Sequence, residues 1–116
     1  MATIYRWDEI PLEQLNPHLS RKVLHGDQVT IAKLWLKQGA VVPRHSHHNE
    51  QVTNVDTGRL KFVFDDGEML VGPGESLQIP AHAPHLVEAL EDTHCTDLFV
   101  PVREDWRTGA DAYLRR

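Results

Sequence analysis

Short apolar runs rich in β-branched and aromatic residues recur through the middle of the chain, about every eight to twelve positions, with glycine and proline between them. This punctuation is typical of an all-β sandwich or barrel. Strands are predicted from these runs at residues 21–25, 29–37, 51–55, 60–64, 68–71, 76–79, 85–90 and 95–100. Because no linker composition or internal repeat interrupts the pattern, residues 1–116 are expected to form one domain.

Glycine-containing turns indicate how two pairs of these strands are joined. Asp66-Gly67 lies between two apolar runs, at a place where a type I′ hairpin turn requires positive φ. Thr57-Gly58 indicates a second tight reversal. The sequence therefore predicts two β-hairpins, one at each glycine.

The two ends of the chain have a different pattern from the middle. The segment IPLEQLNPHL (residues 10–19) has weak helical spacing that Pro17 interrupts. The segment EDWRTGADAYLRR (residues 104–116) also has weak helical spacing, interrupted at Gly109. We therefore expect short helical segments on both flanks of the β-domain.

Composition limits the classes of partner. The 116 residues are 41% hydrophobic and 25% charged, which is enough for one compact domain. The formal net charge is −5, and no basic cluster is larger than the Arg115-Arg116 pair. A chain with this charge is not expected to bind nucleic acid or an anionic membrane surface.

The sequence shows no sign of export or membrane insertion. Its start, MATIYRWDEIPLEQL, has neither a basic segment nor an unbroken apolar run, and no other stretch has the run of apolar residues that a bilayer span requires. The single cysteine, Cys95, cannot form an internal disulfide, which fits a reducing compartment. We therefore expect a cytoplasmic protein with no membrane partner.

Histidine is the unusual residue of this chain, with eight copies. In an extended chain the side chains alternate between faces, so the odd-numbered His45, His47 and Gln51 point the same way. His48 and Glu50 have the opposite parity. Gln51, rather than the more acidic Glu50, is therefore the predicted third metal ligand, unless a β-bulge between positions 47 and 51 reverses the parity.

His85 is the fourth predicted metal ligand. It opens a strand directly after a turn whose backbone Pro80 and Pro84 restrict. Imidazole nitrogens with one amide oxygen suit Ni, Fe, Mn, Zn or Co better than Ca or Mg. The alternative is a hydrated HSHHN loop without a function, with His85 an ordinary strand histidine.

The spacing of these residues favours the metal site over that alternative. The sequence reads Gly39, five residues, His45, one residue, His47, three residues, Gln51, six residues, Gly58, and later Gly74, five residues, Pro80, four residues, His85. This pattern resembles the two signature motifs of the cupin superfamily. The resemblance implies an all-β double-stranded β-helix, a jelly-roll barrel, with a divalent transition metal at its mouth.

Three positions depart from the common cupin motifs. Gln51 stands where many cupins have glutamate, His82 where the second motif has glycine, and Ala89 where it has asparagine. An amide ligand leaves the metal its full positive charge, which favours polarisation of a carbonyl, carboxylate or enolate over oxygen chemistry. The alternative is that Gln51 packs beside a site without function. The roles of His48 and His82 stay open.

The segment CTDLFVPVRED adds candidate chemistry opposite the metal. Cys95, Asp97 and Phe99 share one parity, so a carboxylate and an aromatic ring are predicted to enter the cavity. Arg103 offers a two-pronged donor for the carboxylate of an acidic substrate. The alternative for Asp97 and Arg103 is an ion pair on the surface. Cys95 is expected to be a small core residue.

Residues 33–106, with HSHHNEQVTNV and DLFVPVRED, resemble the KdgF family, small cupins of pectin and alginate breakdown that linearise 4,5-unsaturated uronates. The resemblance implies metal ligands and active-site residues, namely His45, His47, Gln51 and His85, and Asp97, Phe99 and Arg103. Asp97 and Arg103 would be catalytic, and Phe99 and Arg103 would bind the substrate. Asn54 and the tail RTGADAYLRR depart from that family.

The reaction that this resemblance implies is an isomerisation. Opening of the hemiacetal releases an enol, which becomes a ketone once carbon 4 gains a proton. We expect Asp97 to move the proton, Arg103 to hold the carboxylate and Phe99 to shape the wall. The alternatives are another metal-dependent cupin enzyme, such as a lyase, cyclase or dioxygenase, and a non-catalytic cupin that binds a small acid or is purely structural.

The predicted strand at residues 29–37 bears on the oligomeric state. It carries Trp35 and several aliphatic residues, more apolar surface than the interior of a small barrel needs. Barrels of this size often associate through an outer sheet face, so a homodimer is expected. The alternative places Trp35 in the core.

Overall fold

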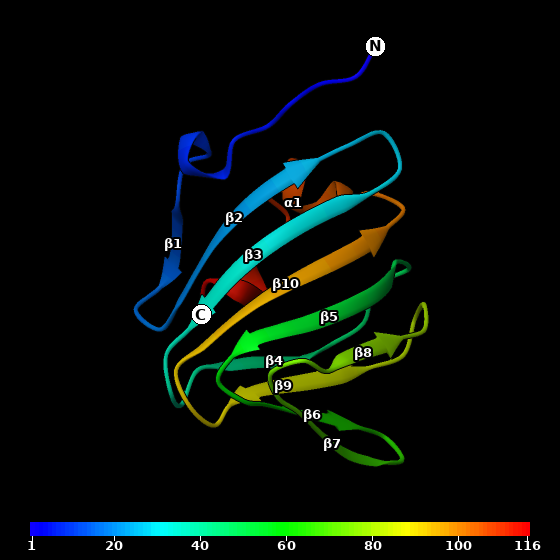
Figure 1. Cartoon of the computed structure of the whole chain (residues 1–116). Coiled ribbons are helices and arrows are strands. Elements are labelled where there is room, and N and C mark those ends of the chain that lie inside the picture. The colour runs from blue at the N-terminus through cyan, green and yellow to red at the C-terminus, as the bar shows by residue number, and fades with distance from the viewer.

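The computed structural model describes residues 1–116 and places ten strands in two antiparallel sheets that face each other (Figure 1). The larger sheet has the order β1-β2-β3-β10-β5-β8, with the bounds Glu13–Asn16, Leu19–His25, Thr30–Leu36, Thr93–Val100, Glu50–Thr57 and Ser76–Ile79. The smaller sheet has the order β4-β9-β6-β7, with the bounds Val41–His45, His85–Ala89, Leu60–Phe64 and Gly67–Val71. This architecture confirms the predicted all-β double-stranded β-helix.

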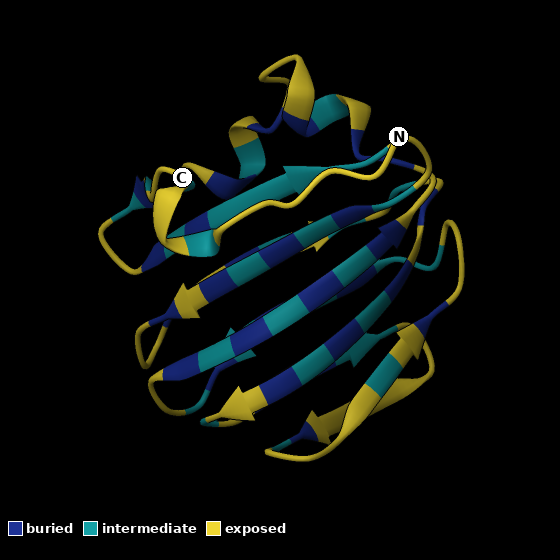
Figure 2. Cartoon of the chain, turned by 45° about the horizontal axis from the view of Figure 1, so that its top comes forward, coloured by how far each residue is buried: buried dark blue, intermediate teal, exposed yellow.

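Burial alternates along the strands of the larger sheet, as the banding of Figure 2 shows, so every second side chain faces the space between the two sheets. On β3, Ala32 and Leu34 are buried, whereas Trp35 is 36% exposed. Cys95 and Phe99 on β10 belong to the same cluster of buried apolar side chains. This period of two is the one that the sequence shows. Trp35 therefore lies outside the core, and the alternative that placed it inside is wrong.

The predicted helix at residues 10–19 is wrong. A single 3₁₀ turn, η1 (Trp7–Glu9), precedes the edge strand β1, which pairs with β2 through Glu13 and Arg21. Leu15 is buried while Gln14 beside it is exposed, which is strand alternation. Pairing with β2 therefore prevails over the weak helical spacing of this segment.

Both turn glycines have positive φ, but the chain reverses differently from the prediction. The expected hairpin joins β6 to β7, yet its turn residues are Asp65 and Asp66, and Gly67 (φ 144°) already belongs to β7. The predicted type I′ turn is therefore wrong. Gly58 (φ 91°) closes no hairpin, because it leads from β5 in the larger sheet to β6 in the smaller one. A Cβ atom there would lie 2.4 Å from the backbone oxygen of Asp92, so only glycine fits.

Short helical turns follow the last strand, as predicted. They are α1 (Glu104–Arg107) and the 3₁₀ turn η2 (Ala112–Leu114), with Gly109 between them. In Figure 1 this orange to red segment lies behind β2 and β3, on the inner side of the larger sheet. Trp106 and Leu114 belong to the buried apolar cluster. None of the helices has the length and apolar character needed to cross a membrane.

Candidate metal centre

Three histidines from the smaller sheet and an adjoining loop meet between the sheets. His45 ends β4 and His85 begins β9, and the two residues lie opposite each other in this antiparallel pair. His47 lies in the loop of residues 46–49 that leads to β5. One candidate ligand atom from each of the three side chains lies within 4.8 Å of the other two. The chain thus provides three imidazole donors in one place.

Each imidazole is oriented by its own backbone. The Nδ1 atom of each ring is hydrogen-bonded to a carbonyl oxygen two residues away, at 2.8 Å for His45 and Pro43, 3.0 Å for His47 and Asn49, and 2.9 Å for His85 and Ala83. Since Nδ1 carries the donated proton, Nε2 of each ring is unprotonated and free to bind a metal. Converging lone pairs repel one another unless a cation lies between them, so this geometry fits a metal ion.

Gln51 on β5 turns its amide oxygen toward this histidine cluster. Its Nε2 donates to Thr53 Oγ1 at 2.9 Å, which leaves Oε1 at 3.1 Å from His47 Nε2. With the proton of His47 on Nδ1, both of these atoms are acceptors. Neighbouring ligands bound to one metal at about 2.1 Å are separated by a similar distance, about 3 Å. Glu50 points outward, where it accepts a hydrogen bond from Gln78 at 2.8 Å.

The route by which these side chains meet differs from the predicted one. The parity argument assumed an extended chain from His45 to Gln51, but β4 ends at His45 and residues 46–49 form a loop. His47 reaches the cluster from this loop. The loop is held by Asn49, whose side-chain nitrogen donates to the backbone oxygen of Pro101 at 2.6 Å.

Burial keeps the imidazoles neutral. Desolvation lowers the pKa of His45 and of His47 to about 4, and it also lowers the pKa of His85. The positive charge of Arg103 acts in the same direction on all three. Neutral imidazole is the form that binds a metal. Three imidazole nitrogens and one amide oxygen can therefore hold a divalent transition metal.

The opposite wall of the cavity comes from β10. Asp97 is buried there, and its Oδ1 atom has no hydrogen-bond partner. Burial raises the pKa of Asp97 to about 7, against the smaller lowering effects of Thr53 and Arg103. The carboxyl can therefore hold or release a proton near neutral pH. The surface ion pair of Asp97 with Arg103 is wrong, because both side chains are buried and Arg103 pairs elsewhere.

Arg103 is held by an acid, a phenol and two aromatic rings. Its Nε and Nη2 atoms donate to the two carboxylate oxygens of Asp105, at 2.9 and 2.7 Å. Its Nη2 also donates to the hydroxyl of Tyr113 at 2.6 Å. Its guanidinium carbon lies 4.7 Å from the ring centre of Phe99 and 4.4 Å from that of Trp106. Burial disfavours its charge, but Asp105 and Tyr113 outweigh this and raise the pKa of Arg103 above its usual value.

These residues enclose a cavity of about 50 Å³. It is lined by His45 and His85 from the smaller sheet, by Gln51 and Asp97 from neighbouring strands of the larger sheet, and by Arg103. Three of the four predicted ligands and the predicted carboxyl thus line the same small space, and His47 adjoins it through its contact with Gln51. A metal bound at the histidines would act within reach of a group that exchanges protons.

Sequence reasoning missed Asp105, which holds Arg103, and two residues of the tail that line the cavity. Asp105 follows Arg103 in the RED triplet, an acid beside a base that could have suggested the ion pair. Tyr113 and Leu114 line the cavity from the tail, where no local pattern points inward. The only sign of Tyr113 and Leu114 in the sequence was that the tail departs from the pattern of the KdgF family.

His48 and His82 have exposed side chains and do not line the cavity. His82 is the one non-glycine residue with positive φ, at 68°. Its backbone nitrogen donates to the carbonyl oxygen of His47 at 2.7 Å. The position where the second motif usually has glycine therefore has a left-handed backbone here too, and it ties the turn before β9 to the loop that carries His47.

Two facing sheets with a histidine cluster between them are the arrangement expected of a cupin. Residues 34–101 match the cupin domain family, so the chain belongs to the cupin family. A comparison with curated protein sequences finds no match.

The chain is similar to several solved cupin structures. It is similar to KdgF from Halomonas sp., with 27% identity over 90% of this chain and 99% of that one and a TM-score of 0.81, which confirms the resemblance seen in the sequence. An RmlC-like cupin from Shewanella frigidimarina has 24% identity over 91% and 96% of the chains and a TM-score of 0.83. The polyketide cyclase RemF from Streptomyces resistomycificus has 21% identity over 87% and 79% and a TM-score of 0.69. The last two show the fold alone.

Proposed function

We propose that this cupin opens the ring of 4,5-unsaturated uronate monosaccharides and yields the linear keto-deoxyuronate, with a divalent transition metal held by His45, His47, Gln51 and His85. The candidate metals are Ni, Fe, Mn, Zn and Co. The observation that carries the proposal is the neutral histidine cluster facing Asp97, a carboxyl with a pKa of about 7, across one cavity. Similarity to KdgF from Halomonas sp. supports the substrate class.

The reaction moves one proton away from the sugar and one proton onto it. The bond between the ring oxygen and carbon 1 breaks as the hydroxyl on carbon 1 loses its proton and becomes an aldehyde. The ring oxygen becomes an enolate oxygen on carbon 5, and a proton added to carbon 4 converts this enolate to a ketone. The product is an isomer of the substrate, so no oxidant or second substrate is needed.

Each residue of the cavity has a role in this reaction. A bound metal supplies positive charge for the negative charge that develops on the enol oxygen. Asp97 moves the proton, because a carboxyl with a pKa of about 7 both donates and accepts near neutral pH. Arg103 holds the uronate carboxylate through its two outer nitrogens, Nη1 and Nη2, while its Nε stays bound to Asp105. Phe99 forms an apolar wall that excludes water.

The test follows the double bond by ultraviolet absorbance. Protein reconstituted with each candidate metal is mixed with an unsaturated uronate, and the absorbance is expected to fall faster than in buffer alone. Asp97→Asn should lower kcat by about 100-fold or more, the usual value of a positioned acid–base group. Asp27→Asn, an exposed carboxylate far from the cavity residues in sequence, is the control. Unchanged activity in Asp97→Asn would remove the proposed role.

Other functions of the same donor set give other results in this assay. A dioxygenase would consume oxygen, and a binding module would hold a small acid tightly without turnover. Elemental analysis of the isolated protein identifies the metal. A protein that takes up none of the five metals would contradict the proposal at its first step.

A further inference from the structure

The C-terminal segment, residues 108–116, covers part of the metal cavity. η2 packs against β4, and Tyr113 and Leu114 both line the cavity. The remaining space of about 50 Å³ holds a few water molecules, whereas pockets for small organic ligands measure roughly 300 Å³ or more. The segment therefore occupies space beside His45 and His85 that a monosaccharide bound in this cavity would need.

Tyr113 makes contacts that an incoming ligand would otherwise make. Its ring lies against the imidazole of His45, with the ring centres 4.7 Å apart. Its hydroxyl oxygen accepts a hydrogen bond from Arg103 Nη2 at 2.6 Å. An oxygen atom of this chain thus already binds the guanidinium that faces the cavity. A carboxylate that binds both outer nitrogens of Arg103 has to replace it.

A buried ion pair anchors the segment to the larger sheet. Asp111 is fully buried and pairs with Arg21 of β2, and its other oxygen accepts from Arg115 at 3.3 Å. Asn16 of β1 donates to the backbone oxygen of Leu114 at 3.0 Å. The anchor therefore lies at the β1 and β2 edge of the sheet, away from the cluster of ligands.

The ion pair of Arg21 with Asp111 leaves buried hydrogen-bond donors without a partner. Arg21 is 1% exposed, and its Nε and Nη1 atoms have no hydrogen-bond partner. Both atoms, and the carboxylate of Asp111, would regain water if the segment left. A buried ion pair with unsatisfied donors adds little net stability, because desolvation offsets its attraction. Such an anchor suits a segment that opens and closes.

We propose that residues 108–116 are a lid on the metal cavity and that Tyr113 competes with the carboxylate of an incoming ligand for Arg103. Opening breaks the contact of Asp111 with Arg21 and removes the Tyr113 ring from His45. The lid follows from the cavity alone, whereas the identity of the carboxylate as a uronate rests on the proposed function. The experiment therefore has one arm that needs neither metal nor uronate.

The first arm measures how accessible the histidines are in metal-free protein. Diethyl pyrocarbonate modifies accessible neutral imidazoles, and mass spectrometry of peptides reports the rate at His45 relative to the exposed His48. Asp111→Asn weakens the anchor and should raise this ratio about tenfold, as a matching shift in the open population requires. Tyr113→Ala should raise it as well with the anchor intact. Asp65→Asn, which breaks the exposed ion pair with Arg44, should leave it unchanged.

A second probe separates lid opening from general loosening. Cys95 is buried in the core, so its reaction with a thiol reagent reports opening of the whole barrel. In Asp111→Asn the rate at His45 should rise while the rate at Cys95 stays low. Equal increases at both sites would show global unfolding and overturn the lid. An unchanged rate at His45 in both variants would overturn it too.

The second arm tests the competition at Arg103. In the metal-loaded protein, Tyr113→Phe removes the hydroxyl and keeps the ring, so KM for the unsaturated uronate should fall about threefold or more because the ligand no longer displaces an oxygen. An unchanged KM, or a change confined to kcat, would contradict the competition. If His45 responds as expected but no variant turns over the uronate, the lid stands and the proposed function fails.

Discussion

At the scale of single residues, the direction of a side chain, and not its acidity, decides which residue can join the histidines as a metal ligand. Glu50 and Gln51 are neighbours on β5, but Glu50 binds Gln78 on the outside and only Gln51 reaches the histidines. A carboxylate in the place of Gln51 would line the same cavity as the buried Asp97, on the neighbouring strand, and two such groups cannot easily both be charged. The amide donates an oxygen to a metal without that conflict.

The neighbouring positions 50 and 51 allow a matched test of the ligand set. Gln51→Ala is expected to weaken metal binding by about 100-fold or more, since loss of an outer partner of a ligand already costs about 10- to 100-fold. Glu50→Ala should have little effect, because its carboxylate is exposed and screened by solvent. A competition titration with a metal-sensitive dye measures both. Wild-type affinity in Gln51→Ala would remove this residue from the ligand set.

Asp97 should make the stability of the metal-free protein depend on pH. Its pKa rises from 3.8 to about 7 on folding, so between these values the folded protein keeps a proton that the unfolded chain has lost. Its contribution to the free energy of unfolding is therefore fully present below pH 3.8, and it is lost as the pH rises through about 7. The contributions of His45 and His47, whose pKa values are lowered to about 4, have the opposite sign and increase as the pH rises toward 6.5.

Comparison with Asp97→Asn isolates the carboxyl, because the histidine contributions are common to both proteins. From about pH 5 to about pH 8, the free energy of unfolding of the wild type should fall by roughly 2 to 3 kcal/mol relative to the variant. Urea denaturation after treatment with a chelator measures this difference. A difference that does not vary with pH would show that the pKa of Asp97 is not raised.

At the scale of elements, strands were predictable where the alternation is long and clear. The runs at 60–64 and 76–79 match β6 and β8 residue for residue. β1 and β4 were missed, because β1 buries one leucine and β4 is short, with Val41 exposed and Pro43 within it. Both strands exist because neighbouring strands pair with them, and that pairing leaves little trace in their own sequence.

Gly58, between β5 and β6, is the turn position where both the backbone conformation and the lack of space require glycine. Gly58→Ala should lower the free energy of unfolding by about 2 to 4 kcal/mol, since a left-handed backbone and overpacking each cost about 1 to 2 kcal/mol or more. Its Cβ atom would lie 2.4 Å from both the Asp92 oxygen and Thr93 Oγ1.

Gly74→Ala is the matched control for that substitution. Gly74 has φ 80°, but a Cβ atom there meets nothing within 4 Å, so only the backbone penalty of about 1 to 2 kcal/mol applies. Thermal or chemical unfolding compares the two. If the two variants lose equal stability, the close approach at Gly58 contributes nothing.

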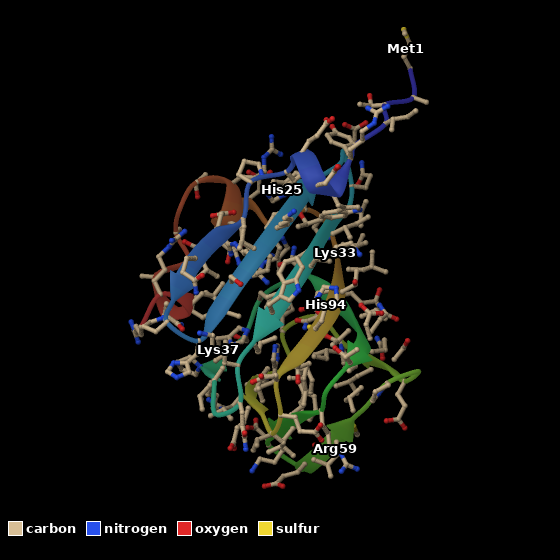
Figure 3. The ribbon with its side chains drawn as sticks, turned by 60° about the vertical axis from the view of Figure 1, so that its left-hand side comes forward. Met1, His25, Lys33, Lys37, Arg59 and His94 are labelled. Carbon is tan, nitrogen blue, oxygen red and sulfur yellow. The ribbon has the colours of Figure 1, made fainter.

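At the scale of the whole molecule, the outer face of the larger sheet carries an apolar row. Leu24, Ile31, Leu98 and Val52 lie opposite one another in register across β2, β3, β10 and β5. Figure 3 shows this side of the molecule, with Lys33 and His94 at the surface. Trp35 stacks on His94 there, with the ring centres 4.6 Å apart. Such a row on an open face supports the homodimer, which stays a prediction.

Light scattering during size exclusion tests that prediction. The wild type should have twice the 13.3 kDa mass of one chain, and Leu98→Asp should have the mass of one chain, because a charge in the middle of the apolar row opposes association. Met69→Asp, on the exposed β7 of the smaller sheet, should remain a dimer. A wild type of single-chain mass would contradict the prediction.

The amino-acid sequence by itself determined the β-rich pattern and the imidazole donors of one motif, because alternation and motif spacing are local properties. Only the tertiary structure decided that His85 lies opposite His45, and that Tyr113 reaches across to Arg103. Contacts between distant parts of a chain depend on which strands pair and which surfaces remain to be covered. That outcome is a property of the whole packed molecule, and no short stretch of sequence contains it.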